Sequence, residues 1–281
     1  MSETVLLAAF CIAGLGLAAW MVVVWGRTRP VRQRLLVESA QALELASTTV
    51  RAAVVGIVGG IIAGVLIAGL GGRLVMRVLA ASSGDSAQGL VTDAGETVGE
   101  VTLAGSLGFV VFNGIFFGMI GGVGYLLMRR WLPATPWLGG LIYGIALLGV
   151  APLDALDPDN SDFAILTPTW LAALLVSCLF PIFGMTAASV VERLDRTWPW
   201  ISARPRALVA YSPLVLALVV SPIAVGILLV VGLVILLNGR PGFVEFWQGR
   251  RAATAGRLVV GVLVGVAAVS AGAAVVEILG A

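Results

Sequence analysis

The sequence contains no histidine and no lysine, and only 11% of its 281 residues are charged. Without histidine there is no imidazole to act as a general base or to ligate haem, zinc or copper. Without lysine no Schiff base can form, so a retinal-binding protein is excluded. Cys11 and Cys178 both lie inside apolar runs, where cysteine usually acts as a small hydrophobic residue. We therefore expect no haem, no retinal and no nucleic-acid partner, and no enzymatic cofactor.

Apolar residues make up 59% of the chain. A soluble domain carries roughly 25% charged residues, so this chain could not cover its own surface in water. The expected solvent is therefore lipid, and the lipid bilayer is the first expected partner. All 17 basic residues are arginine, which together with abundant alanine, glycine and valine indicates a GC-rich genome of actinobacterial type. We expect a multi-pass protein of a bacterial cytoplasmic membrane.

The apolar residues are gathered in runs of the length that a helix needs to cross a bilayer, about 20 residues. Short charged or proline-rich breaks separate these runs. The predicted fold class is an all-α polytopic transmembrane bundle of about seven spans. They cover approximately 5–25, 52–74 with an extension to 81, 101–128, 138–153, 170–191, 209–237 and 258–279.

The distribution of charge between the runs predicts the orientation in the membrane. Arginines fill the breaks after the first, third and fifth runs, and carboxylates fill the breaks after the second and fourth. Because arginine is retained in the cytoplasm, the N-terminus is expected outside and the C-terminus inside. One break disagrees, because its arginines would lie outside: Arg240, Arg250, Arg251 and Arg257. A re-entrant hairpin around Pro222 would remove the conflict, but each arm would have only about 14 residues, too few to span, so a single sixth crossing is expected.

These patterns divide the chain into three parts. Residues 1–50 are predicted to hold a transmembrane anchor and an amphipathic cytoplasmic linker. Residues 51–196 are predicted to form a glycine-rich core of four helices with acidic outer loops. Residues 197–281 would add a C-terminal segment of two transmembrane helices.

Glycines recur at intervals of four in two of the predicted spans. This spacing places them on one helical face, where the missing Cβ lets two backbones approach closely. The interpretation is helix packing, either inside one chain or at a contact between two copies. The glycines are Gly56, Gly60 and Gly64 in the second span, and Gly114, Gly118 and Gly122 in the third.

Charged residues also pair by spacing at the expected outer boundary. Arg73 and Arg77 end the second span, and Glu96 and Glu100 begin the third, each pair four residues apart. Two antiparallel helices would set Arg73 against Glu100 and Arg77 against Glu96, which removes most of the cost of isolated charges near hydrocarbon. This hypothetical ionic latch would either fix the register of the helices or gate a solute.

An acidic segment between the fourth and fifth spans offers hard oxygen ligands. Ca²⁺ takes about six to eight such oxygens from a flexible loop. The segment lacks the glycine and the closing glutamate of an EF-hand, and turn formation is the other interpretation of the same residues. The candidate calcium ligands are Asp154, Asp157, Asp159, Asn160 and Asp162.

Several of these motifs together resemble a family of polytopic membrane proteins from actinobacteria and related phyla, to which no activity is attached. The resemblance covers about half of the chain, from 51 to 190, and implies that spans two to five form a unit. The motifs are Gly56-Ile-Val-Gly-Gly60, Gly72-Arg73-Leu-Val-Met-Arg77, Gly121-Gly122, Arg129-Arg130-Trp131-Leu132-Pro133 and Asp157-Pro-Asp159-Asn160-Ser-Asp162-Phe163.

Two functions remain open from the sequence. The first is a non-enzymatic integral membrane protein, an accessory, assembly or interaction subunit that binds another membrane protein or a second copy of itself. The second is a transporter or channel for a small solute, lipid or ion, gated at the outer Arg/Glu group. An enzyme is not expected, because Asp154-x-x-Asp157 is a single copy of a motif that intramembrane prenyltransferases carry twice.

Overall fold

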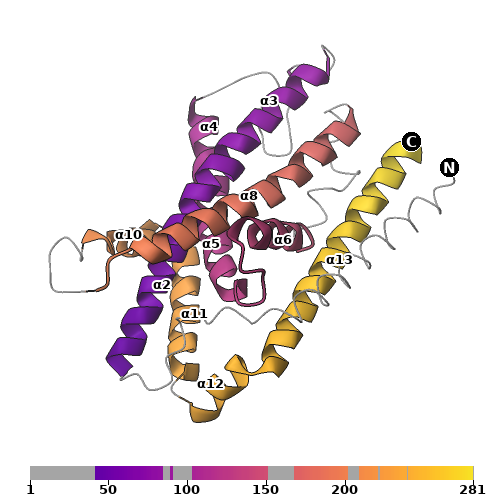
Figure 1. Cartoon of the computed structure of the whole chain (residues 1–281). Coiled ribbons are helices and arrows are strands. Elements are labelled where there is room, and N and C mark those ends of the chain that lie inside the picture. Colours follow the sequence, from indigo (N-terminus) through magenta and orange to yellow (C-terminus); the bar gives the residue numbers. More distant parts are fainter. Residues whose placement is uncertain are drawn as a thin grey trace.

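The computed structural model describes residues 42–84, 89–90, 103–150, 168–201, 209–220, 222–238 and 240–280. Within these ranges the chain is helical and forms no strand (Figure 1). The elements are α2 (Ala42–Ala63), η1 (Gly64–Gly71), α3 (Gly72–Ser82), α4 (Leu103–Phe109), η3 (Val110–Phe116), α5 (Phe117–Met128), α6 (Pro136–Leu148), α8 (Thr169–Thr197), α10 (Ser212–Val220), α11 (Pro222–Asn238), α12 (Pro241–Gln248) and α13 (Arg250–Gly280).

Four helices of the described ranges are long and apolar enough to cross a membrane: Ala46–Ser82, Gly105–Met128, Trp170–Thr197 and Arg250–Ala273. They coincide with the predicted second, third, fifth and seventh spans, which confirms an all-α fold with membrane-spanning helices. The predicted first span lies outside the described residues. The predicted fourth span forms only the 13-residue helix α6, which at 1.5 Å per residue reaches about 20 Å, short of a bilayer core.

Two long helices form the centre of the molecule and run antiparallel. The first is continuous through α2, η1 and α3, and the second through α4, η3 and α5. Each contains a π-helical stretch, and η1 packs against η3. The apolar face that α2 and α5 present to α11 includes Ile57 and Met119, both almost completely buried.

The predicted glycines lie between these two helices. The Cα of Gly64 and that of Gly118 are so close that a Cβ on Gly64 would lie 2.7 Å from the Cα of Gly118. A Cβ on Gly60 would overlap the carbonyl oxygen of Gly118 and lie 2.8 Å from the Cα of Gly122. Gly56 and Gly114 make similar contacts at the two ends of this seam. Only hydrogen atoms fit between the backbones, so the contact is dry and close along its length.

Helix α6 packs on α8 through a second glycine contact. A Cβ on Gly140 would lie 2.5 Å from the carbonyl oxygen of Gly184, and one on Gly144 would lie 2.6 Å from the Cα of Pro181. The buried Tyr143 hydroxyl donates a 2.6 Å hydrogen bond to the carbonyl oxygen of Gly121 in α5. The short helix is therefore fixed to both long neighbours.

The predicted sixth crossing over 209–237 is wrong as a single helix. The chain forms α10 and α11 instead, and Pro222 is the first residue of α11. Proline has no backbone N–H and its ring clashes with the preceding turn, so it is favoured at the first position of a new helix. The Tyr211 hydroxyl, just before α10, donates to the carbonyl oxygen of Pro199, which follows α8.

The α10–α11 pair begins beside the end of α8, and it ends at the same side of the bundle, beside the end of α5. After α11, helix α12 places the Trp247 ring 5.6 Å from the ring of Trp131, which follows α5. The pair therefore enters and leaves at the end where α5 and α8 finish, as in the re-entrant hairpin that its short arms argued against. Two short helices are tolerated here because α2 and α5 cover them on one side.

The sequence analysis predicted that the last helix runs parallel to α5. In the structure α13 instead runs antiparallel to α5. It begins beside Trp131, and a Cβ at Gly256 would overlap the indole ring of that residue. Figure 1 shows its C-terminus on the side where α3 ends and α8 begins. The Arg129 end and the C-terminus therefore lie on opposite sides of the bundle, and the predicted orientation in the membrane stays a prediction. The arginines in the first turns of α13 therefore lie at the same end of the bundle as those that follow α5.

Candidate functional site

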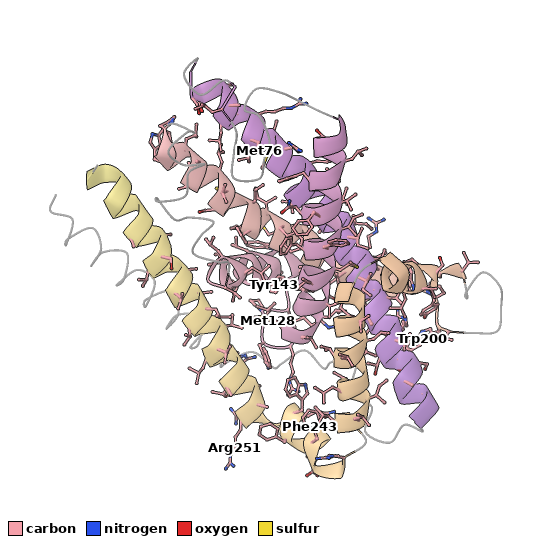
Figure 2. The ribbon with its side chains drawn as sticks, turned by 180° about the vertical axis from the view of Figure 1, so that it is seen from behind. Met76, Met128, Tyr143, Trp200, Phe243 and Arg251 are labelled. Atoms are coloured by element: carbon pink, nitrogen blue, oxygen red, sulfur yellow. The ribbon has the colours of Figure 1, made fainter. Side chains whose placement is uncertain are left out.

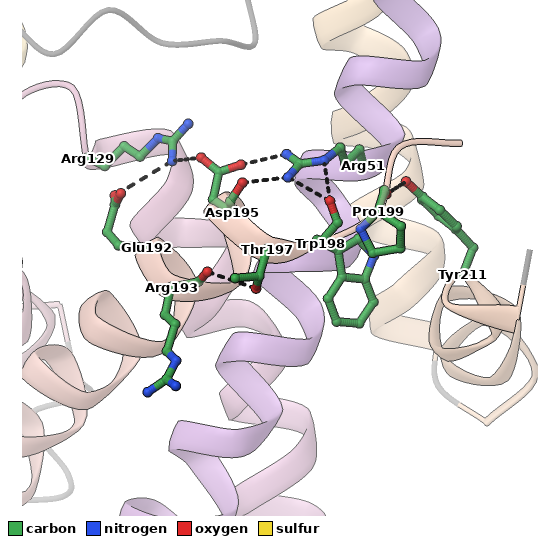
Figure 3. Close-up of polar contacts among 9 residues, drawn as sticks. All are labelled: Arg51, Arg129, Glu192, Arg193, Asp195, Thr197, Trp198, Pro199 and Tyr211. Atoms are coloured by element: carbon green, nitrogen blue, oxygen red, sulfur yellow. Dashed lines mark hydrogen bonds and ion pairs between the residues drawn. The ribbon is translucent and has the colours of Figure 1, made fainter. Parts of the chain in front are cut away.

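Four charged residues from three helices meet at the end of the bundle where α5 and α8 finish (Figure 3). We call Arg51, Arg129, Glu192 and Asp195 the arginine–carboxylate cluster. Arg51 lies in the third turn of α2, and Arg129 is the C-terminal cap of α5. The two carboxylates lie in the last turns of α8. Each sits next to a long apolar helix segment, so the cluster forms where the hydrophobic packing ends.

Arg51 holds the C-terminal end of α8. Its Nη1 lies 2.7 Å from Oδ1 of Asp195, and its Nε and Nη2 donate to the carbonyl oxygen of Trp198 at 3.3 and 3.1 Å. Nη2 also donates to the backbone carbonyl of Asp195. The last carbonyls of a helix have no partner within it and carry partial negative charge, so a guanidinium is a suitable cap. The ring of Trp200 stacks under the same guanidinium at 4.7 Å.

Arg129 binds both carboxylates from the end of α5. Its Nη1 lies 2.9 Å from Oδ2 of Asp195 and 3.6 Å from Oε1 of Glu192. The hydroxyl of Tyr125, one turn earlier in α5, donates to the same Glu192 oxygen at 3.3 Å. Asp195 thus uses one carboxylate oxygen for α2 and the other for α5, and it joins three helices.

The charges of the cluster balance, and its side chains are largely buried except that of Glu192, which is 25% exposed. The side chains of Arg51 and Arg129 are 5% and 6% exposed, and that of Asp195 is 13% exposed. Two cations face two carboxylates, so no unpaired charge remains within these four residues. A buried pair contributes little net stability over a hydrophobic contact, but removal of one partner strands the other and is costly. The arrangement is suited to fixing helix positions, and both carboxylates are committed to arginine.

The structure describes half of the predicted ionic latch. Arg73 lies over the ring of Phe109 at 4.9 Å, where the aromatic face attracts its positive charge, and Arg77 is exposed. Glu96 and Glu100 lie outside the described residues. The latch remains a prediction, with Arg73 placed against the helix that would have to carry its partner.

The candidate calcium ligands Asp154, Asp157, Asp159, Asn160 and Asp162 also lie outside the described residues, and the calcium site remains a prediction. In the part of the chain that the structure describes, no three His, Cys, Asp or Glu side chains are grouped as metal ligands would be. The predicted packing glycines, by contrast, are all described, and they lie between the α2–η1 and η3–α5 segments of the two central helices.

The sequence analysis missed the arginine–carboxylate cluster. Two signals in the sequence could have found it. Arg51 is an isolated charge directly before a long apolar run, and Glu192 and Asp195 are three residues apart, on one face at the end of another. Charges in these positions need a partner, but the sequence alone does not say which one.

The chain matches no protein-family model, no curated protein and no solved structure. The fold and the site therefore define the class by themselves: an all-helical protein with membrane-spanning helices, closed by an ion-pair cluster at one end.

Proposed function

We propose that the chain is a non-enzymatic integral protein of a bacterial cytoplasmic membrane that acts as an accessory or assembly subunit. The observation that supports this best is the glycine seam between α2 and α5. Backbones in direct contact leave no room for a solute between the two central helices. A rigid scaffold that presents its outer helices to a partner fits such an interior.

The chemistry of the cluster supports the same proposal. Ion-coupled carriers need a carboxylate that can release its ion or proton and bind it again. Asp195 and Glu192 are instead held by arginine, and Asp195 accepts from two arginines at 2.7 and 2.9 Å. Carboxylates held in this way serve as structural anchors.

The outer faces of α11 and α13 are the surfaces most suited to a partner helix. Both carry large exposed apolar side chains, among them Leu229 and Leu236 on α11 and Val262 on α13. Lipid covers such faces in a lone protein, and a partner helix replaces the lipid in a complex. These two helices also belong to the C-terminal part that stands beside the α2–α5–α6–α8 core (Figure 1).

The test is purification of the tagged protein from its native membrane in mild detergent, with identification of whatever remains bound. A subunit should bring a stable partner at a fixed ratio. A variant with Leu229→Ser and Leu236→Ser should lose that partner while it keeps its own melting temperature. Isolation of the intact protein alone after crosslinking in the membrane would count against the proposal.

A channel or transporter is the second candidate, and the facing π-helices favour it. π-helical turns occur often at functional sites because they interrupt the regular hydrogen bonding of a helix. Here η1 and η3 lie opposite each other near the middle of two central spans. A cysteine at Ile67, in η1, distinguishes the two proposals. It should resist water-soluble maleimides in a closed scaffold and react with them if η1 lines an aqueous path.

A further inference from the structure

Helix α12 lies where two membrane-spanning helices reach the same end of the bundle. It ends at Gln248, and the span of α13 begins at Arg250. The ring of its Trp247 is 5.6 Å from the ring of Trp131, three residues beyond the span that α5 completes at Met128. Tryptophans in such positions gather at the level of the lipid headgroups. Contacts on both sides therefore hold α12 at that level.

The helix continues neither of its neighbours. Its N-terminal cap Arg240 and its C-terminal cap Gly249 both have extended backbone, which breaks the helical path on each side. Figure 1 shows α12 at the end of the bundle, between the foot of α11 and the start of α13. With 8 residues it is about 12 Å long, far too short to cross the hydrocarbon. A helix of this length at this level is suited to lie along the membrane surface.

The side chains of α12 divide between the bundle, the water and a third direction. Phe243 and Trp247, four residues apart on one face, stack at 5.8 Å and pack toward the bundle through Trp131. Glu245 is exposed and lies nearly opposite Phe243 around the helix. Phe246 lies between these two faces and is 60% exposed. An uncovered aromatic ring on the flank of a surface helix is placed to enter the lipid.

Exposed arginines flank the same helix. Arg240 precedes it, and Arg250 and Arg251 follow it at the start of α13. None of the three forms an ion pair with another described residue, and Glu245 is the one carboxylate in the sequence from 240 to 251. Figure 2 shows Arg251 pointing away from the bundle. This end of the molecule therefore presents an open basic surface around an exposed aromatic ring.

We propose that α12 is an interfacial helix that binds the membrane surface. Phe246 enters the boundary of the hydrocarbon, and Arg240, Arg250 and Arg251 bind the headgroups of anionic phospholipids. An anionic membrane surface attracts guanidinium groups, and these form paired hydrogen bonds with phosphate oxygens. Lipid is favoured over a protein partner because phosphate groups surround a membrane protein at this level in any bilayer. The inference does not depend on the accessory function proposed above.

The test places a bimane fluorophore at Phe246→Cys in the full chain, with Cys11 and Cys178 replaced by serine. The protein is reconstituted into vesicles with equal amounts of phosphatidylglycerol and phosphatidylcholine. In parallel samples one lipid or the other carries a nitroxide on its acyl chain near the headgroup. Both nitroxide lipids should quench the fluorophore, and the phosphatidylglycerol form should quench it more. The same fluorophore at Glu245→Cys should instead be quenched by iodide from the water.

Two variants with the same net charge separate headgroup binding from a general effect of charge. Joint replacement of Arg240, Arg250 and Arg251 by glutamine should remove most of the preference for phosphatidylglycerol, because each arginine at the surface strengthens that affinity about fivefold. The control replaces three exposed arginines of α3 and α8 by glutamine and should keep the preference. These are Arg77, Arg193 and Arg196. If the first variant does not fold, Arg240→Gln alone should show a smaller loss of the same kind.

Three results would overturn the proposal. Quenching at Phe246→Cys by iodide and not by nitroxide lipid would place α12 in water, and protection from both quenchers would mean that a protein covers it. Equal quenching by the two lipids would show that the arginines select no anionic headgroup. An equal loss of preference in the control variant would show that net charge, and not this surface, attracts the lipid.

Discussion

Asp195 makes ion pairs with both arginines of the cluster. It accepts from Arg51 at 2.7 Å and from Arg129 at 2.9 Å, and the same arginine that pairs with its side chain caps the end of its helix. Its partners lie 144 and 66 residues away in the sequence. No local pattern could have predicted this pairing, although the isolated charges themselves were visible.

Asp195→Asn should destabilise the protein strongly, because it strands one of two buried arginines. Breaking a buried ion pair costs roughly 3–5 kcal/mol, and the 13% exposure of Asp195 favours the lower end of that range. Thermal or urea unfolding in detergent measures the change. Arg193→Gln, an exposed arginine two residues earlier, is the control and should have little effect. A negligible change for Asp195→Asn would show that the cluster is not a structural anchor.

Gly60→Ala tests the contact between the central helices. Its Cβ would overlap the carbonyl oxygen of Gly118, so the helices must separate. Inserted methyl groups in a packed core cost about 1–3 kcal/mol, and here backbone rather than side chain must move. Gly265→Ala in α13 is the matched control, because its Cβ would meet no described atom within 4 Å. That control should be neutral or slightly stabilising, since alanine is the better helix former.

At the scale of the elements, the prolines and the glycines have separate roles. The glycines at intervals of four set the distance between α2 and α5, and their spacing alone predicted that face. Pro222 ends one helix and begins the next, whereas Pro181 lies within α8 and leaves it continuous. The sequence shows both prolines inside apolar runs and does not reveal this difference. Neighbouring helices decide it, because Pro181 packs against Gly144.

Cysteine labelling tests the α10–α11 pair directly. In a variant with Cys11 and Cys178 replaced by serine, Ser212→Cys before the hairpin and Glu245→Cys after it should react from the same side of the membrane. Both positions are exposed, so their reactivity reports their side. Reaction from opposite sides would mean that 209–238 crosses the membrane once.

At the scale of the whole molecule, the end with the arginine–carboxylate cluster collects the described arginines of α2, α5, α8 and α13. If the positive-inside rule holds, this end faces the cytoplasm. Arg240, which precedes α12, and the three arginines of α13 were the exception in the sequence analysis, and the α10–α11 hairpin removes that exception. By the same rule, we predict that the end of α13 lies on the outer side.

Reporter fusions after α13 should therefore indicate an external C-terminus. Alkaline phosphatase should be active there and green fluorescent protein dark. Fusions truncated after Met128 give the internal reference, because α5 ends beside the arginines and should give the reverse result. A cytoplasmic signal from both positions would contradict the orientation inferred from the fold and restore the one predicted from charge alone.

The sequence by itself determined the class of this protein and most of its long helices. Apolar runs that match the bilayer thickness can be read locally, because lipid imposes the same length on every crossing. The spacing of four also determined the glycine face. Tertiary structure alone decided which charges meet, where α10 turns back and which way α13 runs. These features depend on residues far apart in the chain, whose pairing becomes favourable only once the packed helices exclude water from them.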